Sequence, residues 1–329
     1  MPNKNVPLNA AARAKRDEFY TRLEDIEREL QHYRPHFRGK VVLCNCDDPF
    51  ESCFFKYFAL NFDLLGLKKL IATSYASKAR GRARKAYRAI VTSVREANGD
   101  SADALDVAEL FRRRENELSE LAGDGDFRSP ECLALLDEAD VVVTNPPFSL
   151  FRKYVATLMD HDKKFLIIGN QNAIKYKEIF PLIMAGRMWL GYGFPGNVAF
   201  FESPYEDRAV SSQHKEGLIR VSGVMWYTDL DIAKRHEPMI LVARYSPDAY
   251  PKYDGYDAIE VSRTKDIPCG YPGIMGVPIT FLTRYCPEQF EIVGELNHGC
   301  DNEHDLGRPV VGGVEKYPRI LIRDRHPKA

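Results

Sequence analysis

Residues 140–169 read DVVVTNPPFSLFRKYVATLMDHDKKFLIIG, and the pattern of apolar and polar residues in this stretch decides the fold. The run from Asp140 to Thr144 predicts a strand, residues from about 149 to 159 predict a helix, and residues 165–169 predict a second strand. A strand, a helix and a strand of these lengths form a βαβ unit, whose two strands run parallel in one sheet.

The alternation of strands and helices continues on both sides of this unit. Further strands are predicted at 41–45, 70–73 and 188–190, and further helices at 10–33, from Asp48 to a stop at Gly66, at 130–138 and near 174–185. Residues 76–100 are polar and basic with weak periodicity, which is typical of a surface excursion. The sequence therefore predicts an α/β fold around a parallel sheet, with no internal repeat.

The character of the sequence changes after residue 191. Residues 192–217 are rich in Gly, Pro, Ser and charge, which predicts an inserted loop. Two strands are then predicted, at 218–227 and 239–244, before residues 245–257 lose all periodicity and the chain ends with a strand at 319–323. We therefore predict one domain over residues 1–244 and a separate C-terminal region over residues 245–329.

Composition and charge exclude several classes of protein. The 329 residues carry Lys+Arg 46 against Asp+Glu 47, a net charge of -1, so the chain is no polycation that binds nucleic acid by bulk charge. No apolar run approaches the ~20 residues of a membrane span, and the N-terminus shows no secretory signal. The seven cysteines form no C-x-x-C pair and the histidines have no metal spacing, so we expect reduced thiols, no metal and a cytoplasmic location.

The turn after the first of these strands carries the strongest chemical signal. Ligands of open α/β sheets bind beyond the carboxyl ends of strands, where Asn145, Pro146, Pro147 and Phe148 stand. The side-chain oxygen of Asn145 and the carbonyl of Pro146 are two acceptors whose geometry the prolines restrict, so they can hold a planar exocyclic amine. The ring of Phe148 can stack on a base, which must be flipped out of a duplex to arrive there. The alternative is an ordinary turn between strand and helix.

Stretches along nearly the whole chain resemble the EcoRI-type adenine-specific DNA methyltransferases, a family within the amino-group DNA methyltransferases. The similar stretches are 17–21, 42–49, 54–59, 65–72, 123–129, 142–151, 163–168, 250–254, 264–268 and 273–282. The resemblance implies a Rossmann-like methyltransferase sheet with helices on both faces and a C-terminal target-recognition region. It also implies transfer of a methyl group from S-adenosylmethionine to the exocyclic amine of adenine in a short duplex site, with GAATTC as a candidate.

The resemblance also implies roles for individual residues. Asn145 and Pro146 would hold the amine, and Phe148 would stack on the base. Asp126 would hydrogen-bond the adenine of the cofactor and Phe127 would contact it. The remaining cofactor candidates are Phe19, Tyr20 and Thr21 near the methionine end, and Asn45, Asp47 and Asp48 on the floor of the site.

The first turn departs from the general pattern of these enzymes. A Gly-rich turn is usual after the first strand, yet residues 45–48 read Asn-Cys-Asp-Asp. Thr73 and Ser74 end the second strand, where an acidic residue often binds the ribose of the cofactor. Either Asp47 or Asp48 is then the candidate for that acidic role.

Two segments are candidates for contact with double-stranded DNA. A basic run is formed by Lys78, Arg80, Arg82, Arg84, Lys85 and Arg88. It can neutralise phosphates, although a solvated surface loop would have the same composition. Tyrosines at 245, 250, 253 and 256 alternate with Lys252 and Arg263, which suits a segment lying along nucleic acid but also a loop packed on a core. Bases would be read by 192–217 and by the region after 245.

Other functions remain open from the sequence. RNA and protein-glutamine amino-methyltransferases share the Asn-Pro-Pro-aromatic string, and a DNA-binding protein without turnover could share the fold. Methylation of the cytosine amine is a weaker option, because an Asn in the first position favours adenine. We expect a monomer. The sequence leaves open whether a cognate restriction endonuclease exists, and such an enzyme would be no physical partner.

Overall fold

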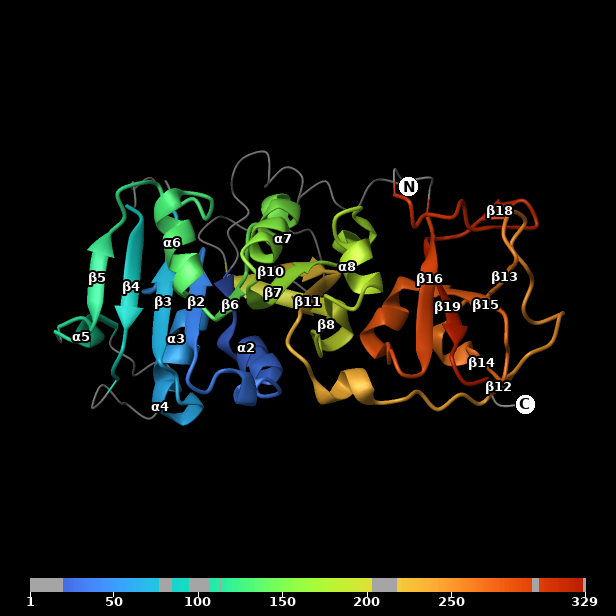
Figure 1. Ribbon diagram of the computed structural model, residues 1–329, viewed down its shortest axis with the longest axis horizontal. Coiled ribbons are helices and arrows are strands. Elements are labelled where there is room, and N and C mark those ends of the chain that lie inside the picture. The colour runs from blue at the N-terminus through green and yellow to red at the C-terminus, as the bar shows by residue number, and fades with distance from the viewer. Residues whose placement is uncertain are drawn as a thin grey trace. The chain divides into compact units, whose positions relative to one another are not determined.

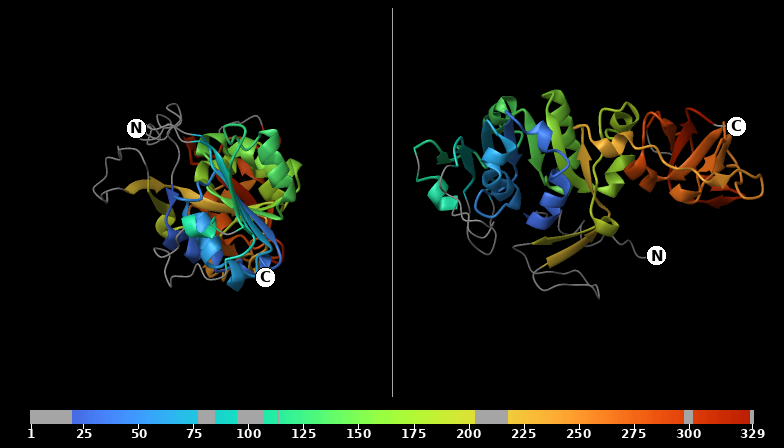
Figure 2. Two further views of the ribbon diagram at one scale, coloured as in Figure 1. Left: turned by 90° about the vertical axis from the view of Figure 1, so that its left-hand side faces the viewer. Right: turned by 90° about the horizontal axis from the view of Figure 1, so that it is seen from below.

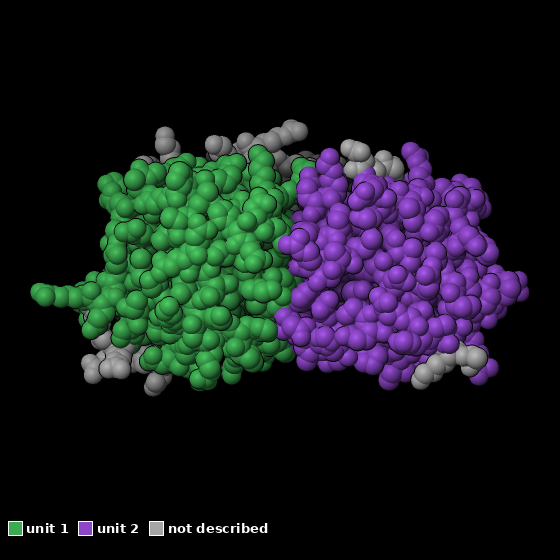
Figure 3. Space-filling model, viewed as in Figure 1, with its two compact units in different colours: residues 1–171, 193–230 green, residues 172–192, 231–329 purple. Residues whose placement is uncertain are grey.

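The computed structural model describes residues 20–76, 85–94, 107–112, 114–202, 218–297 and 302–327. The chain divides into two compact units, coloured separately in Figure 3. Unit 1 comprises residues 1–171 and 193–230, and unit 2 comprises residues 172–192 and 231–329. The structural boundary thus falls near 230, whereas the sequence placed one at 244. The roles that we expect for residues 1–244 and 245–329 stay predictions.

The main sheet of unit 1 positions the candidate site (Figure 1). Its strands in this unit follow in the order β5 (Glu117–Glu120), β4 (Tyr87–Val91), β3 (Lys69–Thr73), β2 (Val41–Asn45), β6 (Val141–Thr144), β7 (Lys164–Asn170) and β11 (Val224–Thr228). The strands from β3 to β7 in this order are parallel, while β4, β5 and β11 are each antiparallel to a neighbour. The predicted α/β class is confirmed, but the sheet is mixed rather than wholly parallel.

Helices cover both faces of this sheet. The helices of unit 1 are α2 (Leu23–Leu30), α3 (Cys53–Leu60), α4 (Phe62–Leu65), α5 (Val107–Leu110), α6 (Pro130–Glu138) and α7 (Phe151–Asp160). Figure 2 shows α6 and α7 on one face and α3 and α4 on the other. Local chemistry sets their ends: the Ser52 hydroxyl accepts the amide of Phe54 at 3.1 Å to begin α3, and Gly66, with a φ of 63°, ends α4 as predicted.

Three predicted segments of unit 1 differ from the structure. The supposed surface excursion at 76–100 contains β4, in which Ala89 and Val91 are fully buried. The supposed loop at 192–217 contains β9 (Val198–Glu202), which pairs antiparallel with β1 (Tyr20–Thr21) and β10 (Leu218–Ser222). The strand predicted at 218–227 is two strands, because Gly223 adopts a φ of 72° between β10 and β11.

Unit 2 is built mainly from short strands. These are β8 (Trp189–Leu190), β12 (Ala243–Arg244), β13 (Ala258–Glu260), β14 (Pro268–Cys269), β15 (Ile274–Pro278), β16 (Phe290–Leu296), β17 (Val310–Val311), β18 (Val314–Glu315) and β19 (Arg319–Asp324), with one α-helix, α8 (Phe180–Met184). One sheet has the order β13-β15-β19-β16, in which β13 and β15 are parallel and the other pairs antiparallel. Its core includes Tyr253, Ala258, Leu296 and Leu321.

Short 3-10 helices connect these elements. They are η1 (Arg34–His36), η4 (Phe148–Leu150), η5 (Gln171–Lys175), η6 (Pro195–Asn197), η7 (Ala233–His236), η8 (Thr264–Asp266) and η9 (Ile279–Arg284). Among the residues that the structure describes, no helix has the length and apolar character needed to cross a bilayer.

Candidate active site

The Asn-Pro-Pro-Phe turn lies at the carboxyl edge of the main sheet. Asn145 directly follows β6, and Phe148 begins η4, which leads into α7. Since β6 runs parallel to β2, this turn stands beside the turn that follows Asn45. Pro146 is buried, whereas Asn145, Pro147 and Phe148 are half-buried. The turn therefore faces the place where a ligand of such a sheet binds.

The amide of Asn145 is oriented by the N-terminal strand. Its Nδ2 donates to the hydroxyl of Thr21 over 3.4 Å, and Thr21 is itself buried in β1. An amide held by its nitrogen presents its oxygen on the opposite side, and an oxygen is the atom that can accept a proton from an amine. The structure thus brings Thr21, which the sequence associated with the cofactor, to the predicted catalytic turn.

A buried network ties the ends of β2 and β6 together. The Thr144 hydroxyl contacts the carbonyl oxygen of Asn45 and lies 2.5 Å from Oδ2 of Asp47. The other carboxyl oxygen of Asp47 accepts the hydroxyl of Ser52 at 2.7 Å. Each of these four side chains is at least 95% buried. The network fixes the backbone directly before Asn145 against the neighbouring turn.

Asp47 has an unusual environment for a carboxyl group. Its complete burial raises its pKa to about 7, although hydrogen bonds from Thr144 and Ser52 act in the opposite direction. The nearby charge of Asp48 raises the pKa further. Asp48 itself accepts the backbone amide of Phe50 at 2.9 Å. A raised carboxyl pKa at the ligand-binding edge of a sheet is a feature that catalytic and binding sites share.

The turn after β2 lacks glycine but keeps a backbone shape that glycine favours. Cys46 has a φ of 67°, in the left-handed region that costs a non-glycine residue roughly 1–2 kcal/mol. The amide of the following Asp47 donates to the carbonyl of Thr73 at 2.9 Å. The sequence of this turn therefore differs from the usual Gly-rich turn in its residue types, but the backbone still turns sharply here.

Tyr154 was missed by the sequence analysis and joins three parts of the site. It lies on α7, its hydroxyl donates to Oδ1 of Asn45, and its ring meets Phe127 edge-on with centroids 5.0 Å apart. Burial raises its pKa well above the usual value, so it is a neutral donor. A buried tyrosine needs a hydrogen-bond partner for its hydroxyl, and this requirement is the signal by which the sequence analysis could have found Tyr154.

The loop that carries Asp126 and Phe127 packs against the end of β3. Gly125 has a φ of 79°, and a side chain there would lie 2.1 Å from the carbonyl oxygen of Ser74. Phe127 is 4% exposed, while the carboxylate of Asp126 receives Nε of Arg128 at 2.8 Å. That hydrogen bond holds the pKa of Asp126 below its usual value. An adenine bound there would share the carboxylate with Arg128, and the cofactor roles of both residues stay predictions.

The end of β3 contributes one further polar group. The Thr73 hydroxyl is buried and has no hydrogen-bond partner among the described residues. Ser74, in contrast, accepts the amide of Tyr87 at 2.9 Å. A buried hydroxyl with an open valence at this edge fits a ligand that carries hydroxyl groups, such as the ribose of a nucleoside.

Only part of the predicted DNA-contact set lies within the described residues. Four members of the basic run, Lys78, Arg80, Arg82 and Arg84, lie outside them, as does the cofactor candidate Phe19. Lys85 is 2.8 Å from a carboxylate oxygen of Glu120, and Arg88 is 2.7 Å from one of Glu117. These two cations therefore already have acidic partners across the β4–β5 pair.

The tyrosine-rich segment of unit 2 buries two of its four tyrosines, whereas Tyr245 is 38% exposed and Tyr256 is half-buried. Tyr253 is 5% exposed and Tyr250 is 8% exposed, and the hydroxyl of Tyr250 donates to the carbonyl of Asp266 at 2.8 Å. Lys252 and Arg263 each lie 2.6 Å from an aspartate, so the alternation of aromatic and basic residues mainly serves contacts within the unit. The described residues contain no group of three or more His, Cys, Asp or Glu that could hold a metal ion.

Comparison with known proteins is consistent along the chain. A sequence model of the family described as "Adenine-specific methyltransferase EcoRI" matches residues 7–325. The chain is 46% identical over 330 residues to "Type II methyltransferase M.EcoRI" of Escherichia coli, with 98% of this chain and 97% of the relative covered. It is 38% identical over 339 residues to "Type II methyltransferase M.MpnI" of Mycoplasma pneumoniae, with 97% and 98% covered. No solved structure matches the chain.

Proposed function

The chain belongs to the EcoRI family of adenine-specific methyltransferases, and on this premise we propose that it methylates the exocyclic amine of an adenine flipped out of duplex DNA. The observation that carries the proposal is the position of Asn145 to Phe148 at the carboxyl end of β6, beside the polar turn after β2. Because a relative with 46% identity is named M.EcoRI, GAATTC is the first site to test.

Four residues at the turn would act on the target base. The side-chain oxygen of Asn145 and the carbonyl of Pro146 accept the two N–H groups of the amine, which localises its lone pair on nitrogen. Pro147 restricts the backbone between these acceptors and Phe148, whose ring stacks on the base. S-adenosylmethionine supplies a methyl group activated by its sulfonium, so the C–N bond forms as the C–S bond breaks and the surplus proton leaves to water. The catalytic contribution is therefore one of positioning and hydrogen bonding.

The residues around the turn fit S-adenosylmethionine. Asp47 and Asp48 supply carboxyl groups for a ligand that bears a sulfonium and an ammonium. The open hydroxyl of Thr73 suits a ribose. Thr21 contacts Asn145 and Tyr20 precedes it in β1, so we assign both to the methionine end. Phe127 meets the ring of Tyr154 and Asp126 precedes it in the loop, so we assign both to the adenine. We assign the cofactor to these groups.

The DNA partner would be held by surfaces outside this cluster. We assign target recognition to the C-terminal region, residues 245–329, and phosphate contact to the basic run between 78 and 88. Phosphate contacts fix the register of the duplex, and contacts to base edges select the sequence. Because the relatives are named type II methyltransferases, we assign the chain to a restriction–modification system.

Asn145→Ala tests the assignment directly. Loss of the acceptor should reduce methyl transfer by at least about 100-fold, the scale of losing one hydrogen bond made in a transition state. Cofactor binding should largely persist, because Asn145 is assigned to the target amine and its 3.4 Å contact with Thr21 is long for a hydrogen bond. Asn61→Ala is the matched control: Asn61 donates to the carbonyl of Tyr57 at the end of α3, so an amide is lost in the same unit but away from the turn.

The assay follows transfer of a tritiated methyl group to duplex DNA with and without GAATTC, to RNA and to a protein extract. Label in DNA alone supports the proposal, and sequencing of the product for modified bases identifies the site. Near wild-type turnover by Asn145→Ala would contradict the assignment of Asn145 as the residue that holds the amine. Label in RNA or glutamine would select the rival amino-methyltransferases, and failure to bind S-adenosylmethionine would indicate a DNA-binding protein without turnover.

A further inference from the structure

The hydroxyl of Thr144 contacts two oxygens but carries one proton. Oγ1 lies 2.5 Å from Oδ2 of Asp47 and is also in contact with the carbonyl oxygen of Asn45. If Asp47 were ionised, both neighbours would be pure acceptors, and the hydroxyl could donate to only one. The other contact would bring two oxygens together with no proton between them. Two buried acceptor oxygens in contact repel each other, and no hydrogen bond between them offsets the repulsion.

A proton on Asp47 resolves the conflict. The carboxyl group then donates from Oδ2 to the hydroxyl of Thr144, and that hydroxyl donates to the carbonyl of Asn45. The second carboxyl oxygen does not act as donor to Ser52, because the Ser52 hydroxyl accepts the amides of Phe54 and Phe55 and directs its own proton at Oδ1 of Asp47. The protons of Asp47, Thr144 and Ser52 then each have one acceptor oxygen. An ionised Asp47 does not allow such an arrangement.

The surroundings of Asp47 favour the neutral form on balance. The other titratable groups whose charge interacts with that of Asp47 are Asp48, Cys44 and Tyr154, and all three are acids. Burial keeps the thiol and the phenol uncharged by raising their pKa values. No lysine, arginine or histidine of the described residues is among the groups that shift its pKa. The start of α3 favours the charged form, but this short helix offsets burial only in part.

We propose that Asp47 is a neutral carboxylic acid in the cofactor-free protein and loses its proton to solvent when S-adenosylmethionine binds. The cofactor step rests on the proposed function, whereas the neutral state of the free protein does not. Asp47 stands at the end of β2, one strand from the turn that must bring the amine to the methyl group. A sulfonium beside it supplies the positive charge that this pocket lacks, and the carboxylate is then the favoured form.

The same step distinguishes cofactor from product. S-adenosylhomocysteine has lost the sulfonium charge, so it gives less reason for Asp47 to ionise. Below the pKa of about 7, affinity for S-adenosylmethionine should fall about tenfold per pH unit, because a proton must leave for each molecule bound. Affinity for S-adenosylhomocysteine should change much less. Asp47 is thus a residue that favours release of the spent cofactor at neutral and higher pH.

The free protein provides the first test. Infrared difference spectra between the wild type and Asp47→Asn, recorded at pH 6 without ligand, should contain the C=O stretch of one protonated carboxyl group. Asn can donate from Nδ2 to Thr144 as the neutral acid does, so this variant preserves the hydrogen bonds and the fold. Absence of that band would overturn the neutral state of Asp47.

Calorimetry in two buffers of different ionisation enthalpy provides the second test. With a pKa of about 7, binding of S-adenosylmethionine should release most of one proton at pH 6 and clearly less at pH 8. Asp47→Asn should release none, and Glu295→Gln, which removes a buried carboxyl group of unit 2 and keeps Asp47, should release as much as the wild type. S-adenosylhomocysteine should release fewer protons than S-adenosylmethionine at the same pH.

The outcomes separate this inference from the proposed function. Binding of S-adenosylmethionine with no proton release, or with equal release by Asp47→Asn, overturns the inference and leaves the function intact. Equal release with S-adenosylhomocysteine overturns the distinction between cofactor and product. A folded protein that binds no S-adenosylmethionine overturns the proposed function together with the release step, whatever the infrared band shows.

Discussion

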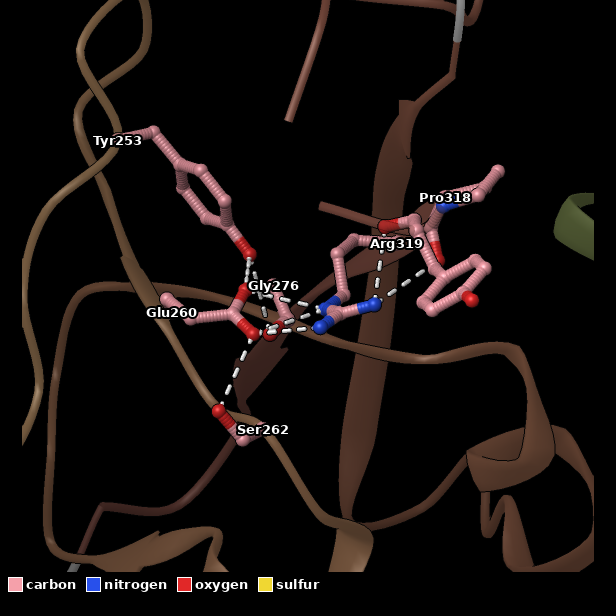
Figure 4. Close-up of polar contacts among 7 residues, drawn as sticks. Tyr253, Glu260, Ser262, Gly276, Pro318 and Arg319 are labelled. Atoms are coloured by element: carbon pink, nitrogen blue, oxygen red, sulfur yellow. Dashed lines mark hydrogen bonds and ion pairs between the residues drawn. The ribbon is translucent and has the colours of Figure 1, made fainter. Parts of the chain in front are cut away.

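Replacing Arg319 with Met should destabilise unit 2 by about 3–5 kcal/mol, the scale of leaving one charge buried and unpaired. Arg319 stands on β19, and its guanidinium holds the carboxylate of Glu260 on β13 (Figure 4). Nε lies 3.1 Å and 3.0 Å from the two carboxylate oxygens, and Nη2 lies 2.6 Å from Oε1. The exposed fractions of the two side chains are 9% and 4%, so water cannot take the place of the guanidinium.

The magnitude follows from what the substitution leaves behind. Glu260 would keep the hydroxyl of Tyr253 and a longer contact with Ser262 at 3.4 Å, but no positive charge. The carbonyl of Tyr317 would also lose the Nη1 donor that now lies 2.9 Å away. Met fills most of the volume of Arg, so the cavity contribution is small. Glu260→Gln together with Arg319→Met should therefore be less destabilised than Arg319→Met alone, because no buried charge remains.

Urea unfolding of the full chain measures both variants. The two tryptophans report separately, since Trp189 lies in unit 2 and Trp226 in unit 1, and a Trp226→Phe background isolates the unit 2 signal. A loss below about 1 kcal/mol for Arg319→Met would show that the pair behaves like an exposed one, and the argument from burial would fail. Glu260→Gln alone is measured as well, and a double variant whose loss equals the sum of the two single losses would refute the argument from charge.

Two further predictions concern pH and salt. Glu295 is fully buried and its pKa is raised to about 7, so the folded state binds more protons than the unfolded state between about pH 4.5 and 7. Wild-type stability should fall across that window by at most ~3 kcal/mol, and urea midpoints of Glu295→Gln should not show this fall. Neutralising the basic residues of 78–84 should reduce the slope of log DNA affinity against log salt by up to about 3 to 4, whereas Lys85 and Arg88, which have acidic partners, should change it little.

Long periodic segments made the centre of the fold predictable. The strand at 41–45 and the helix at 130–138 have the bounds that the sequence indicated, because continuous apolar runs and a Ser-Pro start leave few alternatives. The strand β4 was missed because its basic and tyrosine residues conceal the buried Ala89 and Val91. The strands of unit 2 were mostly missed because runs such as β13 are three residues long and gain their stability from partners distant in sequence.

The division into units had no local signal. Residues 172–192 continue the pattern of helix and strand that precedes them, yet they belong with residues 231–329. Which elements pack together is decided by tertiary contacts, and a single sequence without a composition break does not contain that information. The change of character after 191 marked the return of the chain to unit 1 at 193, not the start of the second unit.

The parts of the candidate site that consist of consecutive residues were predictable. The turn at 145–148 and the polar turn at 45–48 were found because both follow strands. Thr144 and Tyr154 were not singled out, since each acts on Asn45 across about a hundred residues of sequence. Thr144 ends a strand and Tyr154 lies within a helix, so neither stands out until the order of the strands brings both hydroxyls to Asn45.

The proton on Asp47 also bears on how the catalytic turn is held. Two prolines restrict the backbone after Asn145, but the backbone before it is held through the hydroxyl of Thr144. While Asp47 is neutral, that hydroxyl donates to Asn45, so the ends of β6 and β2 are joined backbone to side chain. Once Asp47 is ionised, the hydroxyl turns to the carboxylate and releases the carbonyl of Asn45. If Asp47 loses its proton as proposed, the hydrogen bond that changes lies one residue before Asn145, so we expect cofactor binding and the position of that amide to be coupled.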